Sequence, residues 1–335
     1  MKTIVCDEPH RLSLVERPMP ERAAGEVLIR IARVGICGTD YHIFAGNQPF
    51  LSYPRVMGHE LAGHVVAADP DSPLATGELV TINPYLACGT CVACRKGKPN
   101  CCTQIHVLGV HTDGGMAEYL TVPESAVVRV PGLTPDQAAM VEFLAVGYHA
   151  VRRGDTAAGD RVLVVGAGPI GVGVALFARL TGADVTLTDT SAERLARACD
   201  IVGVEGVVVD AGIRDTLAAR TDGDFYDIVF DATGNVRAME AGFGFVAHGG
   251  SYVLVSVVKD DVTFADPEFH KREMRLIGSR NALADDFAGV IAAIAGGQVP
   301  TDRIRTHDFA LDEAPARFPE LIAGQASVLK AIATV

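Results

Sequence analysis

Four cysteines with metal-ligand spacing are the strongest chemical signal in the sequence. Cys88, Cys91, Cys94 and Cys102 follow the pattern C-x2-C-x2-C-x7-C. Four thiolates can close a tetrahedral shell around Zn²⁺, and a closed shell leaves no position for a substrate. The spacing therefore predicts a structural zinc, with Cys101 as an alternative fourth ligand and an iron–sulfur cluster as a further option.

A glycine-rich motif, G-x-G-x-x-G, predicts a dinucleotide site. Its glycines are Gly166, Gly168 and Gly171, after the apolar run RVLVV and at the start of a helical stretch. Such glycines let the backbone approach a pyrophosphate at a helix N-terminus, where free N–H groups and the dipole favour anions. Asp189 ends the next apolar run, where a carboxylate binds ribose hydroxyls and repels a 2′-phosphate, so NAD is favoured over NADP. Arg194, five residues further on, could pair with a 2′-phosphate and would favour NADP instead.

A third set of residues is scattered along the chain. It comprises Cys37 in GICGTD, His59 and Glu60 in GHE, and Glu142 near the start of a helix. One Cys, one His and one or two carboxylates make a mixed shell that leaves a position for water or substrate, as in catalytic zinc sites. Taken singly, each has a structural alternative, since a lone Cys is usually core and a helical Glu is usually solvated.

Composition bounds the class of protein. The 335 residues correspond to about two domains. A net charge of -12 makes nucleic acid or an anionic membrane a poor general partner, because such binding needs clustered Lys and Arg, and it leaves room for a local basic pocket. The N-terminus carries charges too often to contain the apolar h-region of a secretory signal, and the apolar stretch 162–178 is too short and glycine-rich to span a bilayer. We therefore expect a cytoplasmic protein with a small-molecule substrate.

Hydrophobic patterns indicate the elements that position these residues. Short strands are predicted at 26–34, 64–68, 78–82 and 119–122, and Thr134 with Gln137 predicts a capped helix that continues to about Arg152. The apolar runs RVLVVGAG, ADVTLTD, GVVVD, FYDIVFDATG and GSYVLVSV then alternate with helical segments, which indicates a parallel sheet covered on both faces. The tail adds a helix (FAGVIAAIAGG) and a strand (VLKAIATV) and is expected to pack on the first domain. The predicted domains are 1–149 with 286–335, and 150–285.

The motifs together resemble the zinc-dependent medium-chain dehydrogenase/reductase family over essentially the whole chain. GICGTD, GHELAGHV, the four-cysteine lobe, DGGMAEYL and VGAGPIG occur in that family's order. The resemblance implies an α/β fold, in which a GroES-like, mostly β catalytic domain carries an inserted Rossmann domain with a doubly wound parallel sheet. It places the lobe at about 84–103 and favours Cys102 as fourth ligand, because in the family an Asn, here Asn100, stands two residues before that cysteine.

The resemblance also implies roles for individual residues. Cys37, His59 and a carboxylate would hold a catalytic zinc, with Glu60 either ligating or one shell out. Glu142 begins EFLAVGYHA, similar to the family's E-P-L-A-V-x-x-H-A, with Phe143 in place of Pro. Thr39 and His42 have the spacing of the family's proton relay, and two zinc ions per chain, NAD and a homodimer or homotetramer are expected. The remaining expected cofactor contacts are Pro169, Ile170, Ala232, Thr233, Ser279 and Arg280.

Within the family, three segments resemble the sugar-acid dehydrogenases that act on L-galactonate or L-gulonate at C5. These segments are GNQPFLSYPRVMGHE, GVHTDGG and DPEFHKREMRLIGSRNA. A polyhydroxylated substrate needs directional polar groups, and we expect Asn47, Gln48 and His111 to contact its hydroxyls, with turn hydrogen bonding as the alternative role. Arg280 would face the substrate carboxylate or the cofactor.

Three other functions are consistent with parts of the sequence. A sorbitol-type or L-threonine-type dehydrogenase would use the same motifs. A zinc-ribbon nucleic-acid binder would use the lobe, but the net charge and the few basic residues nearby, such as Arg95, Lys96 and Lys98, oppose it. A scaffold that binds only the nucleotide is opposed by the presence of Cys37 and His59.

Overall fold

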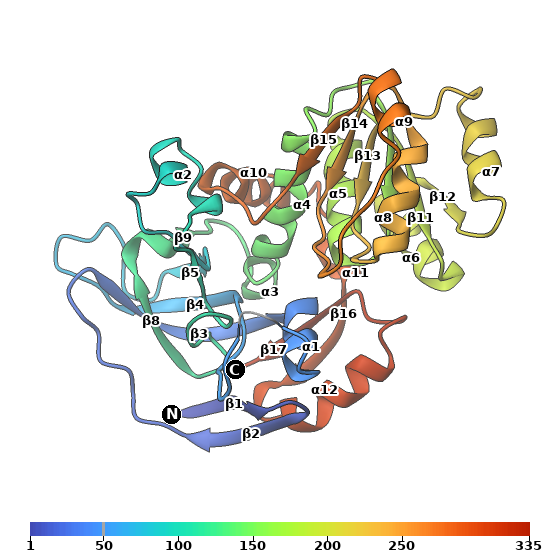
Figure 1. Cartoon of the computed structure of the whole chain (residues 1–335). Helices are drawn as coiled ribbons and strands as arrows, with labels where there is room; N and C mark the ends of the chain where they lie inside the picture. Colours follow the sequence, from blue (N-terminus) through green and yellow to red (C-terminus); the bar gives the residue numbers. More distant parts are fainter. Residues whose placement is uncertain (49–50) are drawn as a thin grey trace. The chain divides into compact units, whose positions relative to one another are not determined.

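The computed structural model describes residues 1–48 and 51–335 and divides into two compact units (Figure 1). The first unit comprises Met1–Phe143 and Leu283–Val335, and the second comprises Leu144–Ala282. The second unit is thus an insertion in the chain of the first. The Pro-Phe pair of the GNQPF motif lies outside the described residues.

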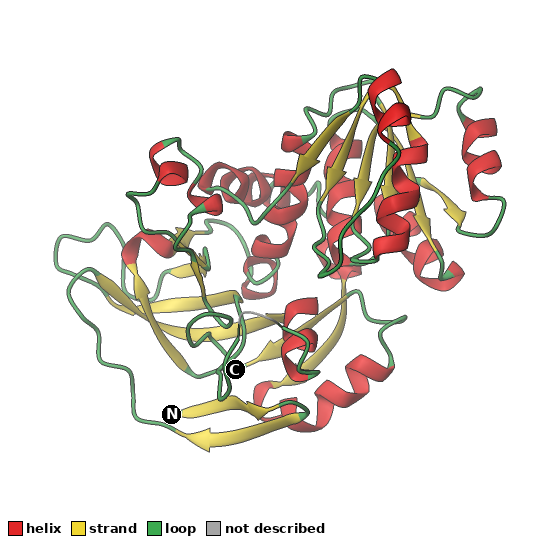
Figure 2. Cartoon of the chain, viewed as in Figure 1, coloured by secondary structure: helices red, strands yellow, loops and turns green. Residues whose placement is uncertain are grey.

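The first unit is built on a mainly antiparallel sheet (Figure 2). Its strand order is β16-β17-β3-β4-β5-β9, and β8 also pairs with β3. Strand β3 lies centrally because apolar residues alternate along it, so that one face enters the core. The strands of this unit are β1 Lys2–Glu8, β2 Arg11–Glu16, β3 Glu26–Ile36, β4 Glu60–Ala67, β5 Leu79–Ile82, β6 Tyr85–Leu86, β7 His106–Val107, β8 Tyr119–Pro123, β9 Val127–Arg129, β16 Arg305–Ala310 and β17 Lys330–Thr334.

The helix predicted from Thr134 to about Arg152 is wrong in one respect, because the structure has two helices there. The capping box of Thr134 and Gln137 is confirmed. However, the N–H of Met140 donates to the carbonyl of Gln137, and this tighter three-residue bond ends the first helix. The helices that begin in the first unit are α1 Gly38–Phe44, α2 Val92–Arg95, α3 Pro135–Ala138, α4 Val141–Arg153, α10 Ala284–Ala295, α11 Thr301–Ile304 and α12 Ala314–Ala323.

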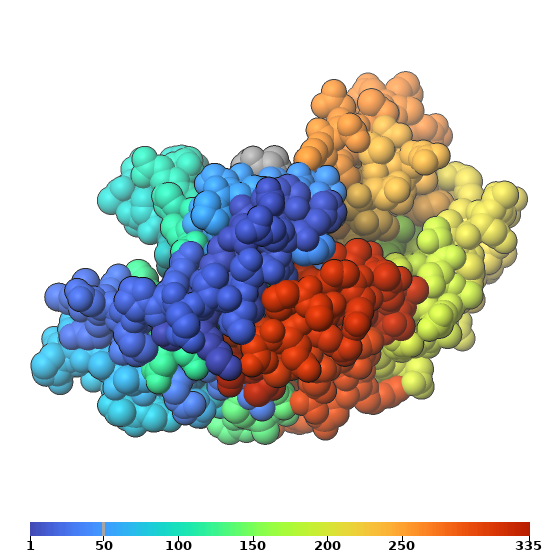
Figure 3. Space-filling view, turned by 90° about the horizontal axis from the view of Figure 1, so that it is seen from below, coloured from blue at the N-terminus to red at the C-terminus, as the bar shows by residue number. Residues whose placement is uncertain are grey.

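The tail of the chain is part of the first sheet. Strand β17 pairs antiparallel with β3, with Ala331 opposite Ile36. Helix α12 packs on β2, and Figure 3 shows the C-terminal segment in red against the N-terminal strands in blue. Residues from both ends of the sequence therefore complete one structural unit.

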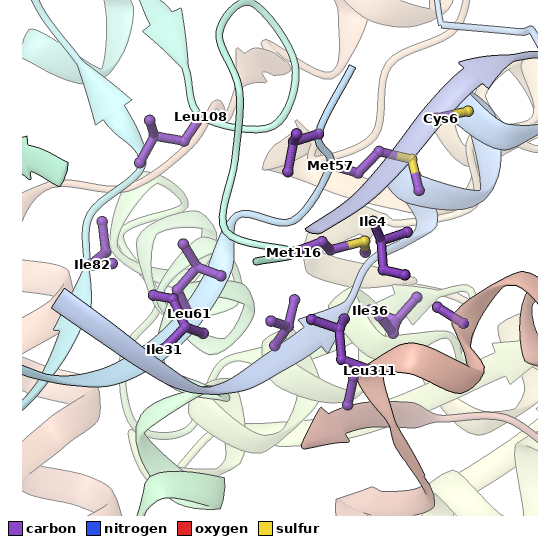
Figure 4. Close-up of a cluster of buried hydrophobic side chains, with 14 of the residues drawn as sticks. Ile4, Cys6, Ile31, Ile36, Met57, Leu61, Ile82, Leu108, Met116 and Leu311 are labelled. Carbon is purple, nitrogen blue, oxygen red and sulfur yellow. The ribbon is translucent and has the colours of Figure 1, made fainter. Parts of the chain in front are cut away.

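A continuous apolar core fixes these strands relative to one another. Figure 4 shows side chains from β1, β3, β4 and the tail in this core, among them Ile4, Ile31, Leu61 and Leu311. All four are less than 5% exposed. Because β3 and β4 are anchored by this core, the loops that follow or precede them have fixed end points.

The second unit is a six-stranded sheet in which every neighbouring pair is parallel. Its order, β12-β11-β10-β13-β14-β15, is the doubly wound order of a Rossmann domain, so the predicted fold class is confirmed. The strands are β10 Arg161–Val165, β11 Asp184–Asp189, β12 Glu205–Val208, β13 Tyr226–Asp231, β14 Val246–Leu254 and β15 Arg275–Gly278. The helices are α5 Pro169–Leu180, α6 Ala192–Val202, α7 Ile213–Arg220, α8 Val236–Gly242 and α9 Asp266–Lys271.

Across the described residues, no helix combines the length and apolarity needed to cross a membrane.

Candidate metal centres and dinucleotide site

Two adjacent strands of the first unit bring three potential metal ligands together. Cys37 follows β3 and precedes α1, while His59 stands directly before β4 and Glu60 begins it. Gly35 of β3 is opposite Glu60 of β4, so the pairing register places the three side chains side by side. Their ligand atoms all lie within 4.8 Å of one another.

Asp40 joins the two loops that carry Cys37 and His59. One carboxylate oxygen accepts from the N–H of Cys37 at 2.9 Å, and the other accepts from the N–H of Gly58 at 3.3 Å. Nδ1 of His59 lies 4.0 Å from the second oxygen. Asp40 is fully buried, and burial raises its pKa. The carboxyl group therefore ties together the two loops that carry Cys37 and His59, while Nδ1 of His59 has no hydrogen-bond partner among the described residues.

The electrostatics of this centre suit a cation. Burial alone would lower the pKa of His59, but Cys37, Asp40 and Glu142 together raise it well above its usual value. A buried position that retains a proton against desolvation is one where a positive charge is stabilised. Sulfur, imidazole and carboxylate donors within 4.8 Å of one another match the preferences of Zn²⁺, so these residues fit a zinc ion.

Glu142, at the start of α4, is also buried at this centre, with 4% exposure. The phenol of Tyr85 donates a hydrogen bond to its Oε1. Burial and the adjacent Glu142 carboxylate raise the pKa of Tyr85, so the phenol keeps its proton and remains a donor. Tyr85 occupies one Glu142 oxygen and thereby fixes the carboxylate plane.

Lys330 of β17 forms an ion pair with Glu60. Both residues are at most 1% exposed, and Nζ lies 2.7 Å from each carboxylate oxygen. A Cβ added to Gly35 would stand 2.2 Å from Oε2 of Glu60. Gly35 therefore provides the space that this carboxylate occupies.

The predicted relay residues lie on α1, one turn apart. Thr39 is half-buried and His42 is exposed. A spacing of three residues places both on the same side of the helix.

The predicted substrate contacts have different environments. Asn47 is exposed, whereas Oε1 of Gln48 is buried and has no hydrogen-bond partner among the described residues. Nδ1 of His111 accepts a hydrogen bond from the N–H of Val107 at 3.1 Å, so this tautomer carries its proton on Nε2. The alternative role expected for His111, hydrogen bonding within its own turn, therefore applies to its Nδ1 atom.

The four-cysteine lobe is closed at its neck by the pairing of β6 with β7. The Sγ atoms of Cys88, Cys91, Cys94 and Cys102 lie within 4.8 Å of one another, while Cys101 is exposed and stands outside this group. Backbone N–H groups surround the sulfurs, and hydrogen bonds from Cys94 and Thr103 lower the pKa of Cys91 to about 5. Because a thiolate is the form that binds metal, the lobe is suited to a fully sulfur-coordinated zinc ion.

The glycine motif of the second unit forms the turn between β10 and α5. Gly166 has φ of 102°, in the region that favours glycine. A Cβ on Gly171 would lie 1.8 Å from the carbonyl oxygen of Gly166, so helix and turn touch directly. A Cβ on Gly168 would meet no protein atom within 4 Å, which leaves its side of the turn open to a ligand.

Asp189 supports the same turn from the end of β11. Its oxygens accept from the N–H of Ala167 at 2.9 Å and from the N–H of Ser191 at 2.8 Å. Arg194 lies 3.6 Å from the carboxylate. The structure thus brings together the acidic residue and the basic residue that carry opposite expectations for the 2′-phosphate of NADP.

The other expected cofactor residues follow the strand ends of the same sheet. Pro169 and Ile170 begin α5, and Ala232 and Thr233 follow β13. Ser279 is buried after β15, with an Oγ that has no partner among the described residues, and Arg280 is exposed beside it. All these positions lie beyond carboxyl ends of parallel strands, where ligands bind in open α/β sheets.

Comparison with known proteins identifies the family. Residues 23–132 match the alcohol dehydrogenase GroES-like domain, and residues 169–296 match the zinc-binding dehydrogenase domain. The chain is 40% identical to L-galactonate-5-dehydrogenase of Escherichia coli (strain K12) over 100% of this chain and 99% of the relative. The chain therefore belongs to the zinc-dependent medium-chain alcohol dehydrogenase family, and it is an oxidoreductase that acts on CH–OH donors.

Two solved structures share the fold at full length. A short chain alcohol dehydrogenase (rspB) from E. coli CFT073, complexed with NADH, has a TM-score of 0.93 and 30% identity, covering 100% of this chain and 99% of its own. A zinc-binding dehydrogenase from Sinorhizobium meliloti 1021, bound to NADP, has a TM-score of 0.90 and 28% identity, covering 100% and 99%. Both kinds of nicotinamide dinucleotide therefore occur among structural relatives.

Three residues of the first metal centre were missed by sequence reasoning. Asp40 stands within the GICGTD motif, where its position three residues after Cys37 could have indicated a support for the loop. Lys330 is a lone charge in the apolar run VLKAIATV, which is a signal for a buried ion pair. Tyr85 has no such signal, because its contact with Glu142 spans 57 residues.

Proposed function

We propose that this enzyme oxidises the C5 hydroxyl of a linear six-carbon sugar acid, of the L-galactonate or L-gulonate type, to the 5-keto acid with NAD as hydride acceptor. The observation that carries the reaction class is the buried group of Cys37, His59 and Glu60. The full-length similarity to L-galactonate-5-dehydrogenase supports the substrate class.

In this proposal Cys37, His59 and a carboxylate from Glu60 or Glu142 hold a catalytic zinc. A zinc ion supplies Lewis acidity, which lowers the pKa of an alcohol and prepares its carbon for hydride loss. The hydroxyl of Thr39 accepts the departing proton, and the exposed His42 passes it to solvent. The hydride goes to the nicotinamide, so that the alcohol loses two electrons and one proton leaves for solvent.

The polar residues expected to contact the substrate suit a polyhydroxylated molecule. The unpartnered Oε1 of Gln48 can accept from a substrate hydroxyl, and a buried acceptor left unpaired costs about 1–3 kcal/mol. Asn47, which is exposed, offers further hydrogen bonds, and His111 is proposed as an additional polar contact. Arg280 supplies a positive charge for the substrate carboxylate or the cofactor. An alcohol that lacks these hydroxyls would leave the polar groups unsatisfied, which lowers its catalytic efficiency.

The preference for NAD follows from Asp189. Its carboxylate faces the turn through two backbone hydrogen bonds, and its charge opposes a 2′-phosphate. Arg194 lies 3.6 Å from the carboxylate and partly offsets this charge, so we expect a moderate preference for NAD, with measurable activity on NADP.

We further propose two zinc ions per chain, with the second in the four-cysteine lobe. The cysteines of the chain are free thiols in the structure, and free thiols persist in a reducing compartment, which supports a cytoplasmic location. A homodimer or homotetramer is proposed as the assembled state, and light scattering measures it directly.

The decisive experiment is a substrate panel followed by NADH absorbance. L-galactonate, L-gulonate, sorbitol, L-threonine and ethanol are compared at matched concentrations with NAD and with NADP. We expect the hexonates to exceed the other alcohols by at least about a hundredfold in kcat/KM. Comparable turnover of sorbitol, threonine or ethanol would overturn the sugar-acid assignment, and equal efficiency with NADP would overturn the cofactor preference.

A further inference from the structure

A cavity of about 560 Å³ lies at the amino ends of three neighbouring strands of the second unit. Its lining includes Arg161, which begins β10, Asp227 near the start of β13, and Val246, which begins β14. The glycine turn follows the opposite, carboxyl end of β10, so the cavity is separate from the expected cofactor site. Its volume is within the range of small-molecule sites, about 300–1,000 Å³.

Strand β14 forms one wall of this cavity because it leaves the regular ladder there. Residues 247–250 bulge out opposite the single residue Asp227 of β13. Gly249 in this bulge has φ of 79°, in the region that favours glycine. His248 beside it lines the cavity and is exposed, and its imidazole has no hydrogen-bond partner among the described residues.

The loop 221–225 forms another wall. Two of its residues, Asp222 and Phe225, have φ of 54° and 65°, a conformation that costs a non-glycine residue about 1–3 kcal/mol. The N–H of Phe225 donates to Oγ1 of Thr221 at 3.0 Å, and the guanidinium of Arg214 lies 4.8 Å from the centroid of the Phe225 ring. The surrounding structure thus holds a strained loop in place, as is typical of preformed ligand sites.

Hydrogen-bond donors and acceptors both line the cavity. The guanidinium of Arg161 donates from Nη1 to the carbonyl of Thr221 at 3.1 Å, which leaves its other N–H groups available. Oδ2 of Asp227 accepts from the backbone N–H of Arg161 at 2.8 Å, whereas Oδ1 has no hydrogen-bond partner among the described residues. The carboxylate of Asp224 lies 3.7 Å from Nη1 of Arg161, and its side chain is 80% exposed. Available donors and acceptors therefore lie close to one another.

The charges of the lining disfavour a strongly charged ligand. Arg161 and Arg272 are balanced by Asp224 and Asp227, and the guanidinium of Arg272 is already held by two backbone carbonyls and a carboxylate. An anion or a cation would therefore meet repulsion as well as attraction. A hydroxyl group is both a donor and an acceptor, so neighbouring hydroxyls can pair with Arg161 and with an aspartate together. Phe225 adds an aromatic surface to the lining.

We propose that this cavity is a second ligand site, which binds a small neutral polyhydroxylated molecule such as a free sugar or a polyol. Its hydroxyls bind the available N–H groups of Arg161, the carboxylates of Asp224 and Asp227, and the imidazole of His248. The ring of Phe225 packs against the C–H groups of the ligand. The site lies entirely within the second unit and requires neither the proposed metals nor the dinucleotide.

The test combines hydrogen exchange with calorimetric titration of the full chain as purified, with no dinucleotide added. The neutral probes are D-glucose, D-sorbitol and myo-inositol, and inorganic phosphate is the charged probe. We expect at least one neutral probe to slow amide exchange in residues 221–225 and 246–250, and to bind there more tightly than phosphate. Asp224→Ala removes an exposed carboxylate from the lining and should raise the Kd of that probe at least about tenfold, and His248→Ala should raise it as well.

Asp222→Asn is the matched control. Asp222 belongs to the same loop and lies 3.9 Å from the guanidinium of Arg161, but it does not line the cavity. Asparagine removes the charge and tolerates the positive φ of this position. The Kd of the probe should therefore remain within about twofold of the wild-type value.

Several outcomes would overturn this inference. Unchanged exchange in both segments with all three neutral probes would show that the cavity binds none of them, and tighter binding of phosphate would show that the ligand class is wrong. Protection confined to the segments around Cys37 and His59 would place the polyol at the first metal centre instead. A loss of affinity in Asp222→Asn as large as in Asp224→Ala would refute direct contact with the lining. The substrate panel tests the proposed function separately, because the cavity lies outside that site.

Discussion

Two glycines of the dinucleotide turn should differ in their response to alanine. Gly171→Ala should lower the stability of the fold, whereas Gly168→Ala should weaken cofactor binding. In Gly171→Ala the new Cβ would lie 1.8 Å from the carbonyl oxygen of Gly166, well inside van der Waals contact. The helix and the turn must separate by more than an ångström to accept it, and overpacking of this kind costs about 3 kcal/mol or more. For a domain of this size such a loss lowers Tm by about 6–12 °C.

Gly168→Ala should leave the stability unchanged. Gly168 has φ of -74° and ψ of -178°, which alanine adopts without strain, and its Cβ would meet no protein atom within 4 Å. If a pyrophosphate approaches this side of the turn, the methyl group intrudes on it, and we expect the Kd for NADH to rise at least about tenfold, or about 1.4 kcal/mol. Gly168→Ala therefore separates cofactor contact from folding.

The assay is calorimetry of the cofactor-free protein together with NADH binding by fluorescence. Gly173→Ala is the matched control on the same helix, since its Cβ would lie at an ordinary 3.8 Å from Gly147 and Leu144. It should raise Tm slightly, because alanine favours a helix over glycine by about 1 kcal/mol. An unchanged Tm in Gly171→Ala would refute the close packing of α5 against the turn. Wild-type NADH affinity in Gly168→Ala would refute the approach of the cofactor to this side of the turn.

Three other predictions address the metal lobe, a buried acid and the cofactor preference. Cys91→Ser should remove one zinc per chain by metal analysis and destabilise the lobe, whereas Cys101→Ser should retain full zinc content; equal losses would refute the ligand assignment. Burial raises the pKa of Asp231 to about 6 from 3.8, so the native state binds more protons between these pH values and stability falls as pH rises through them, by at most about 3 kcal/mol. Asp231→Asn still accepts the hydrogen bonds of Thr233 and should show a smaller loss of Tm between pH 4 and pH 7; a drop as large as in wild type would contradict this. Asp189→Asn should lower the ratio of kcat/KM for NAD over NADP by about tenfold, since a charge-assisted hydrogen bond is worth about 1.5–3 kcal/mol, and an unchanged ratio would assign the preference elsewhere.

Local patterns predicted the second unit better than the first. The apolar runs of β10, β11, β13 and β14 are buried on both faces, so each strand can be recognised from its own sequence as a continuous apolar segment. Strand β15 was missed because its sequence, RLIG, lies at the sheet edge after charged residues, and three of its four residues are exposed. The interruption between α3 and α4 was also missed, since a single backbone bond to Gln137 ends the first helix and no glycine or proline marks it.

The metal centre shows a different limit of sequence reasoning. Cys37, His59 and Glu60 are expected from motifs, and the strand register of β3 and β4 explains why they meet. The partners that orient them are set by tertiary packing across long separations, as in the contacts of Tyr85 with Glu142 and of Lys330 with Glu60. A motif reports the donor atoms, whereas hydrogen bonds from distant segments determine how those donors are held.

The pairing of Lys330 with Glu60 has a consequence for the order of biosynthesis. The two residues are 270 positions apart, and at about 5–20 residues per second the ribosome needs about 14–54 s to make the intervening chain. During that interval Cys37, His59 and Glu60 can already have emerged, while the strand that carries Lys330 does not yet exist. The carboxylate of Glu60 lacks its buried cation until β17 arrives, and an unpaired charge is costly to bury, so this part of the core is expected to close only when the end of the chain has been made. Nascent chains stalled before and after β17 should accordingly differ in their resistance to proteolysis around β4.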